Sequence, residues 1–209
     1  NEILFYAQQI REGTESPAAF VDGLLDPDAQ DEFNPSADAF GSDEDEEEGG
    51  GLSAKQLEEL KRGSLEKLDR IAKFFDKMRK AFELDGYRSP AYNKAQESIS
   101  NELMLIRFTA KTVERLCNTL RNQVEQVRTL ERAILKTCVD RCGMPREYFI
   151  KVFPGNETNL NWALTEIQSG KSYSSVLERN LPSIHELQQK LIDLQARVVV
   201  PLQDLKDIN

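Results

Sequence analysis

The fold of this chain is decided by residues 99–138, which read ISNELMLIRFTAKTVERLCNTLRNQVEQVRTLERAILKTC. Apolar side chains recur there four and three residues apart, the spacing that places them on one face of a helix. We call these positions the seam, and all twelve except Glu131 are apolar. They are Ile99, Leu103, Ile106, Ala110, Val113, Cys117, Leu120, Val124, Val127, Glu131, Ile134 and Cys138. The spacing predicts one helix from Ser89 to Arg141, about 80 Å long at about 1.5 Å per residue.

So long an apolar seam needs a partner, and the residues before it supply one. Ser53 and Gln56 form the sequence pattern of a capping box at a helix N-terminus. Helical spacing of apolar residues then continues to Phe82, Gly86 ends this helix, and Pro90 begins the next. We therefore expect residues 53–82 to pack antiparallel against the long helix as a helical hairpin.

Shorter helices are predicted after the long one, which Gly143 and Pro145 end. They are expected at 145–153, around Trp162, at 172–181, from 182 to about 198 with Pro182 as the first helical residue, and from 201 onward. Within the seam we expect Leu130 to replace the polar Glu131, because a repeat of seven drifts around a helix. No strand pattern occurs, so the fold class is all-α.

The N-terminal quarter has a different character from the rest. Residues 1–52 carry a net charge of −14 and residues 53–209 a net charge of +5. Residues 1–40 predict a short helical segment, with helices at 2–12 and about 20–25. Residues 41–52 read GSDEDEEEGGGL, and because clustered carboxylates repel and bury nothing, they predict a disordered acidic linker. The expected domains are then a helical body at 53–200 and a truncated further segment at 201–209.

Composition removes several classes of protein. No run of apolar residues approaches a membrane span, and the N-terminus lacks the pattern of a signal peptide. Three cysteines form neither a disulfide framework nor a zinc site, which favours a reducing cytoplasm. A single histidine, His185, leaves little acid–base or metal chemistry, so we expect no enzyme, no metal, no cofactor and no small-molecule substrate. Cys138 and Cys142 are interpreted as packing thiols, the alternative being part of a metal site.

Basic residues are the candidate functional site. They lie on or just after the second half of the predicted long helix: Arg121, Arg128, Arg132, Lys136, Arg141 and Arg146. Such a row binds phosphate or an acidic partner without reading sequence. The alternative is an ordinary solvated helix face, with the bases paired to Glu125 and Glu131. No aromatic residues are interleaved with the bases, which argues against stacking of single-stranded nucleic acid.

One stretch resembles a known family. The resemblance rests on Leu130-Glu131-Arg132, Cys138 with Cys142, Met144-Pro145, Phe149, Phe153, Gly155-Asn156-Glu157-Thr158 and Trp162. Together they resemble the non-conserved region of primary (vegetative, sigma-seventy type) sigma factors, the promoter-specificity subunits of bacterial RNA polymerase. Residues 206–209 resemble the beginning of that family's region 2, and the acidic linker occupies the place of its acidic insert.

The resemblance implies a non-catalytic helical insert between conserved regions 1.2 and 2. Such an insert contacts the polymerase β′ subunit, aids release from the promoter and lies near the upstream edge of the −10 element. The six basic residues are then candidates for contacts to the polymerase or to the DNA backbone. An arginine that approaches DNA in the family would fall near Ser16, where this sequence has none. The residues that read promoter elements lie beyond Asn209.

Two other functions stay open on the residues alone. A helical scaffold or adaptor would use the long hairpin to engage another coiled coil, and would self-associate through an exposed seam. An enzyme with a reactive thiol at Cys138 or Cys142 would require a lowered thiol pKa.

Overall fold

The structure is a computed structural model that describes residues 2–25 and 53–207. Its elements are α1 (Glu2–Glu12), α2 (Pro17–Phe20), β1 (Val21–Leu24), α3 (Ala54–Leu84), α4 (Pro90–Met104), β2 (Ile106–Phe108), α5 (Ala110–Lys136), η1 (Thr137–Arg141), α6 (Arg146–Val152), α7 (Asn161–Gln168), α8 (Ser174–Val198) and α9 (Leu202–Asp207). Most of the described residues are helical, and their one sheet has only two short strands, which confirms the all-α class. The linker predicted at 41–52 lies outside them. No described helix is long and apolar enough to cross a membrane.

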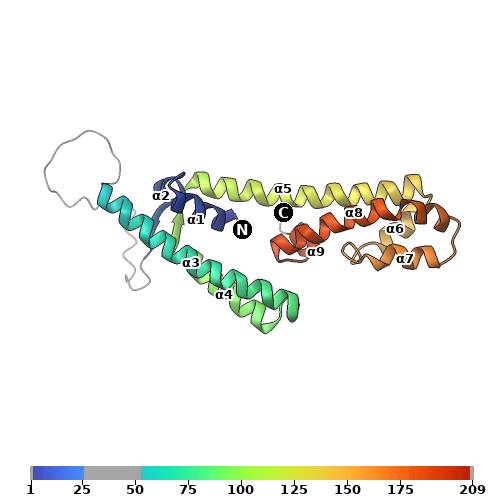
Figure 1. The fold of residues 1–209 in the computed structure, drawn as a ribbon, viewed down its shortest axis with the longest axis horizontal. Helices are drawn as coiled ribbons and strands as arrows, with labels where there is room; N and C mark the ends of the chain where they lie inside the picture. The colour runs from blue at the N-terminus through green and yellow to red at the C-terminus, as the bar shows by residue number, and fades with distance from the viewer. Residues whose placement is uncertain (1, 26–52, 208–209) are drawn as a thin grey trace. The chain divides into compact units, whose positions relative to one another are not determined.

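The chain divides into two compact units, Asn1–Arg115 and Leu116–Asn209. In the first unit α3 and α4 lie side by side and antiparallel, as Figure 1 shows. The predicted start of α3 is confirmed, since the Ser53 hydroxyl accepts from the Gln56 backbone and the Gln56 side chain accepts from the Ser53 backbone. The predicted hairpin therefore exists between α3 and the first part of the expected long helix.

The prediction of one helix from Ser89 to Arg141 is wrong, because the chain leaves the helix at Leu105. Residues Ile106–Phe108 form β2, which pairs antiparallel with β1 in a two-stranded sheet. The helix begins again as α5, where the Thr109 hydroxyl accepts a hydrogen bond from the Thr112 backbone. A strand in this place buries Ile106 beside α1, α2 and α3, a gain that the local apolar spacing does not reveal.

The second helix expected at about 20–25 is also wrong. Only Pro17–Phe20 is helical, and Val21–Leu24 form strand β1. Phe20 and Val21 are buried, and the Phe20 ring meets that of Phe108 at 5.4 Å between centroids. The strand is stabilised by a partner more than eighty residues away, so a pattern of neighbouring residues could not predict it.

Gly63 lies where α3 packs against β1. A Cβ atom at this position would lie 2.5 Å from Cδ1 of Leu24. Alanine stabilises a helix interior by about 1 kcal/mol over glycine, but here the added methyl group requires the Leu24 side chain to move. We expect Gly63→Ala to give no net stabilisation, and to raise the free energy of unfolding by about 1 kcal/mol once Leu24→Ala has cleared the space. Urea denaturation of the four proteins of this double-mutant cycle checks it, and additive effects would contradict the contact.

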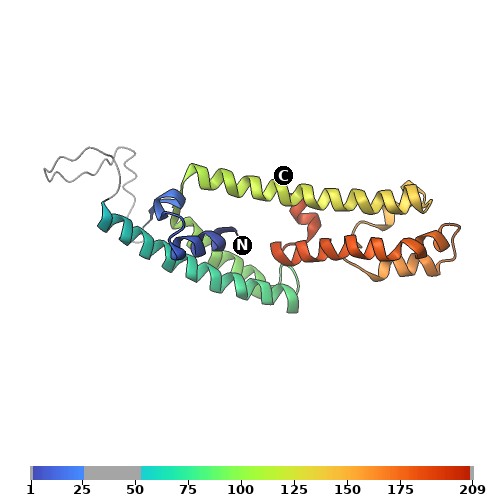
Figure 2. The same ribbon diagram turned by 45° about the horizontal axis from the view of Figure 1, so that its top comes forward.

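The second unit is built around α8, which lies alongside the second half of α5 in both views (Figures 1 and 2). Leu177, Ile184 and Leu191 of α8 are fully buried with Val127 and Ile134 of α5. The seam of α5 is therefore covered by α8 in this unit, rather than by residues 53–82 as expected. The reason is that α3 and α4 bury their apolar residues against each other and α1, in a separate core.

Pro182 was predicted to begin a helix, and this is wrong because it lies inside the continuous helix α8. A proline within a helix costs about 3 kcal/mol, chiefly through one lost backbone hydrogen bond and a steric clash. Leu177 before it and Ile184 after it are both 0% exposed in the same core. Burial of apolar side chains on both sides of Pro182 outweighs that cost.

The end of the predicted long helix is confirmed near Arg141. The last turn widens into the π-helical segment η1, in which the Cys142 amide donates to the Thr137 carbonyl. Gly143 follows with φ +79, a left-handed conformation that glycine adopts without a Cβ clash. Cys138 and Cys142 are both buried, as expected for packing thiols.

Burial raises the pKa of the Cys138 thiol to about 12, with a smaller contribution from Cys142. In the unfolded chain a thiol ionises near pH 8.5, about its ordinary value. Above that pH the unfolded state binds fewer protons than the folded state. We therefore expect the free energy of unfolding to fall as pH rises, by at most about 1.4 kcal/mol per pH unit from this group.

The measurement is urea denaturation with a reductant present, from about pH 8 to about pH 10, for the unchanged chain and for Cys138→Ala. The slope of stability against pH should be shallower in the variant. Equal slopes would show that this thiol does not titrate differently in the two states.

Candidate functional site

The six predicted basic residues lie on three successive elements of the second unit. Arg121, Arg128, Arg132 and Lys136 are on α5, Arg141 is the last residue of η1, and Arg146 is the first residue of α6. All are exposed except Arg128, which is half-buried. Arg121 donates to the Asn118 side chain at 3.3 Å, and Arg132 pairs with Glu125 at 3.1 Å. The expected pairing with Glu125 is thus confirmed for one base.

A groove of about 290 Å³ brings two of these bases, Arg128 and Arg132, together with apolar side chains. Its first wall is α5, with Arg128, Glu131, Arg132 and Leu135. Its second wall is α6 and the turn after it, with Phe149, Ile150, Phe153, Pro154 and Glu157. Its third wall is α9, with Gln203 and Lys206. We call this the α5–α6–α9 groove. Arg121, Lys136, Arg141 and Arg146 do not line it.

A half-buried ion-pair cluster lies in the α5–α6–α9 groove. Lys206 pairs with Glu131 at 2.7 Å and with Glu157 at 3.8 Å, and the three side chains are 18%, 21% and 11% exposed. The expectation that Glu131 pairs with the bases of its own helix is therefore wrong, because α9 supplies a closer cation. Leu130 packs against the core as expected. The cluster ties α9 to α5 and to the turn that follows α6.

The turn that carries Glu157 is held in place by a buried amide. Gln188 of α8 is 0% exposed and donates from Nε2 to the carbonyl oxygens of Asn156 at 3.2 Å and Asn159 at 3.1 Å. Buried donors that are satisfied in this way fix a loop that has no regular structure. His185, one turn earlier, forms a hydrogen bond to the Leu160 carbonyl at 3.0 Å through Nε2. These contacts position the second wall of the groove.

Aromatic residues lie nearer to the basic residues Arg128 and Arg132 than the sequence suggested. Phe149 and Phe153 of the second wall are stacked, with ring centroids 4.7 Å apart. They are only 3% and 4% exposed, so they form the floor of the groove and offer no open ring face on which a nucleobase could stack. Ile150 is the open apolar residue, at 53% exposed. Sequence reasoning missed Ile150 and Lys206, although the polar residue Glu131 within an apolar seam was a signal that a partner cation existed.

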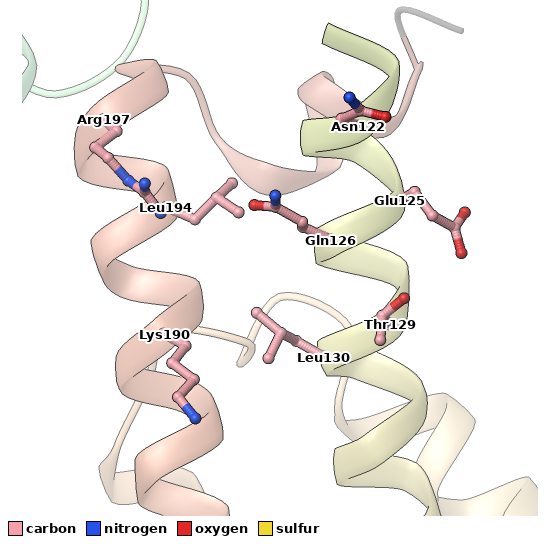
Figure 3. A pocket seen from close by; sticks show the side chains of 8 residues that line it. All are labelled: Asn122, Glu125, Gln126, Thr129, Leu130, Lys190, Leu194 and Arg197. Atoms are coloured by element: carbon pink, nitrogen blue, oxygen red, sulfur yellow. The ribbon is translucent and has the colours of Figure 1, made fainter. Parts of the chain in front are cut away.

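A second cleft, of about 490 Å³, lies between α5 and α8. Figure 3 shows Gln126 and Leu130 pointing from α5 toward α8, Leu194 pointing back, and Glu125 pointing away. Of its two cations, Lys190 is paired with Glu186 at 2.8 Å, and Arg197 donates from Nε to the Asp193 carbonyl at 3.4 Å. The α5–α8 cleft therefore offers less unsatisfied charge than the α5–α6–α9 groove.

Ligand chemistry of other kinds finds little support in the described residues. Among them no group of three or more His, Cys, Asp or Glu side chains is arranged to hold a metal ion. Burial raises the pKa of Cys142, partly offset by Arg141, and raises that of Cys138 further. A raised pKa is the opposite of what a nucleophilic thiolate requires. The groove and the basic residues beside it remain the candidate site.

Comparisons with known proteins are consistent with a single family. The sequence profile of the family described as "Sigma-70, non-essential region" matches residues 1–195. The chain is 35% identical over 158 residues to a protein named RNA polymerase sigma factor RpoD, from Neisseria gonorrhoeae. The matched part is 76% of this chain and 25% of that relative, so the chain spans about a quarter of the length of the curated relative.

Proposed function

Since this chain belongs to the sigma-70 family, as a fragment of a primary sigma factor, we propose that it is the helical insert that docks the factor onto bacterial RNA polymerase. The insert contacts the β′ subunit, lies near promoter DNA at the upstream edge of the −10 element, and performs no catalysis. Its place of action is the bacterial cytoplasm. The observation that carries the proposal is the family match over residues 1–195.

The distribution of charge supports a role in binding. Arg128, Lys136, Arg141 and Arg146 form no ion pair with any carboxylate among the residues that the structure describes. Solvated cations of this kind attract polyanions or acidic protein surfaces and lose affinity as salt rises. The proposed DNA contact therefore depends on these charges. The arginine that approaches DNA in the family is missing from this chain, since its place near the N-cap of α2 is taken by Ser16.

A scaffold that self-associates through its seam finds less support. Val124, Val127, Ile134 and Cys138 of the seam are buried within the second unit. This covered half of the seam has little apolar area left for a second coiled coil, whereas Ala110, Val113 and Cys117, in the first turns of α5, are exposed.

The first test is binding of the purified 209-residue chain to purified β′, with the β subunit as the control. We expect binding to β′ that weakens as salt rises, and none to β. Equal binding to both subunits, or none to either, would overturn the β′ assignment.

The second test measures DNA binding by fluorescence anisotropy, with a promoter duplex and a scrambled duplex. The isolated chain should bind both weakly and alike, and more weakly at higher salt, because phosphate contacts do not read sequence. A nanomolar complex with the promoter alone at physiological salt would contradict the proposal.

A further inference from the structure

We propose that the α5–α6–α9 groove is a protein-docking site whose occupant is an acidic segment of a polymerase core subunit that carries a large apolar side chain. This inference rests on the proposed function, because it names core polymerase as the source of the occupant. It goes beyond that function in assigning the contact to one groove and to one chemistry.

The first argument is the charge of Arg128. Arg128 is half-buried and lines the groove, and within the described part of the chain no carboxylate pairs with it. Arg132, one turn further along α5, pairs with the exposed Glu125. An exposed pair is worth little, so an incoming carboxylate can displace it at small cost. A planar guanidinium at the edge of a low-dielectric surface favours a carboxylate held by two hydrogen bonds.

The second argument is the apolar surface beside that charge. Ile150 is 53% exposed and lines the same groove as the buried rings of Phe149 and Phe153 and as Leu135. A large apolar side chain placed there would be removed from water on several sides, which is worth about 1.5–3 kcal/mol when burial is complete. The groove volume of about 290 Å³ suits a few side chains of a polypeptide.

The third argument separates a protein occupant from nucleic acid. Glu131 and Glu157 also line the groove, and both are engaged by Lys206. A phosphate backbone would bring several charges close to these two carboxylates, at a cost in like-charge repulsion. A single carboxylate can reach Arg128 while its neighbouring apolar side chain enters beside Ile150. The groove thus fits an acidic and apolar peptide segment, and the exposed bases outside it suit DNA better.

The test uses the full-length sigma factor that contains this chain, assembled with core RNA polymerase of the same bacterium. A photo-crosslinking residue, p-benzoylphenylalanine, replaces Ile150 in one protein and Leu164 in a control. Leu164 is also exposed in the second unit, at 38%, and does not line the groove. Holoenzyme formation is measured by gel filtration before irradiation, so that a failure to assemble is seen separately from a failure to crosslink.

We expect Ile150 to crosslink a core subunit at least about fivefold more than Leu164 does. Mass spectrometry should place the crosslink in a segment with an aspartate or glutamate within one helical turn of a large apolar residue. Adding Arg128→Glu should lower the yield about fivefold, as expected for loss of a close charge pair. Adding Arg179→Glu, at an exposed arginine of α8 that does not line the groove, should leave the yield within about twofold.

Four results would overturn the inference. The first is a holoenzyme that assembles while Ile150 crosslinks no more than Leu164. The second is capture of promoter DNA. The third is a crosslink to the factor's own chain, which would mean that this chain covers the groove. The fourth is failure of the factor to assemble with core at all, which would refute the proposed function as well.

Discussion

Replacing Trp162 with alanine is expected to lower the free energy of unfolding of the second unit by about 3–5 kcal/mol. Trp162 is 5% exposed and packs edge-on against Phe149 at 5.9 Å and Phe153 at 5.1 Å between ring centroids. Alanine would leave a cavity beside the two stacked phenylalanine rings. The loss is comparable to the whole stability of a small domain, so the second unit should be largely unfolded.

The measurement is hydrogen–deuterium exchange by mass spectrometry, since removal of the single tryptophan also removes its fluorescence. Protection should collapse across residues 145–198 and persist in α3. Leu164→Ala, at an exposed position of the same helix, should cost less than about 1 kcal/mol. Trp162→Phe should cost less than alanine, because it keeps a ring and removes an indole nitrogen that has no hydrogen-bond partner in the described structure. Unchanged protection in Trp162→Ala would contradict the packing.

Replacing Glu166 with alanine is expected to lower the free energy of unfolding of the second unit by about 3 kcal/mol, at about 1.5 kcal/mol for each of two lost hydrogen bonds to a charged group. Glu166 is 8% exposed. It accepts from the Tyr148 hydroxyl at 2.9 Å and from the Tyr173 hydroxyl at 2.9 Å, and so joins α6, α7 and the start of α8. Lys171 also donates to it at 3.1 Å, but that lysine is 37% exposed and water can replace the contact.

Chemical denaturation of three variants checks the role of Glu166. Glu166→Gln should cost less than alanine, because an amide can still accept one of the two hydroxyl hydrogens. Glu178→Ala removes an exposed glutamate of α8 and should change stability by less than about 0.5 kcal/mol. In a Tyr173→Phe background the cost of Glu166→Ala should fall by about 1 kcal/mol, as a double-mutant cycle requires of a direct contact. A Glu166→Ala protein as stable as Glu178→Ala would show that the network is not formed.

Tyr173 and Lys171 of this network make the second unit less stable at high pH. Burial raises the pKa of Tyr173, and the Tyr148 side chain, followed by Tyr173 and Glu166, raises that of Lys171. Both groups hold their protons in the folded state to a higher pH than in the unfolded state. Their contribution is therefore complete below about pH 10, the ordinary range of both side chains, and is lost as pH rises above it.

Helix ends were predicted where their chemistry is local. The capping box at Ser53, the helix start at Pro90 and the helix end at Gly143 were predicted from a few neighbouring residues and are confirmed. Each depends on hydrogen bonds or backbone angles within one turn of chain. Such signals need no partner, so the sequence contains them in full.

The candidate site was predicted only in part, for a different physical reason. Arg128 and Arg132 line the α5–α6–α9 groove, and their charge and spacing could be read directly. Ile150 and Lys206 join them from α6 and α9, elements far along the chain. Only the packing of those elements against α5 decides that an exposed isoleucine and a lysine belong to the same surface.

The sequence alone determined the all-α class, the helix caps and the separation of an acidic N-terminal part from a basic remainder. The tertiary structure alone decided that β1 and β2 interrupt the long seam, that Pro182 stays inside α8, and that α8 covers α5. In each of these cases an apolar stripe could be satisfied by more than one partner. The hydrophobic effect is not directional, so the partner that covers each apolar face is determined only by the packing of the whole folded chain.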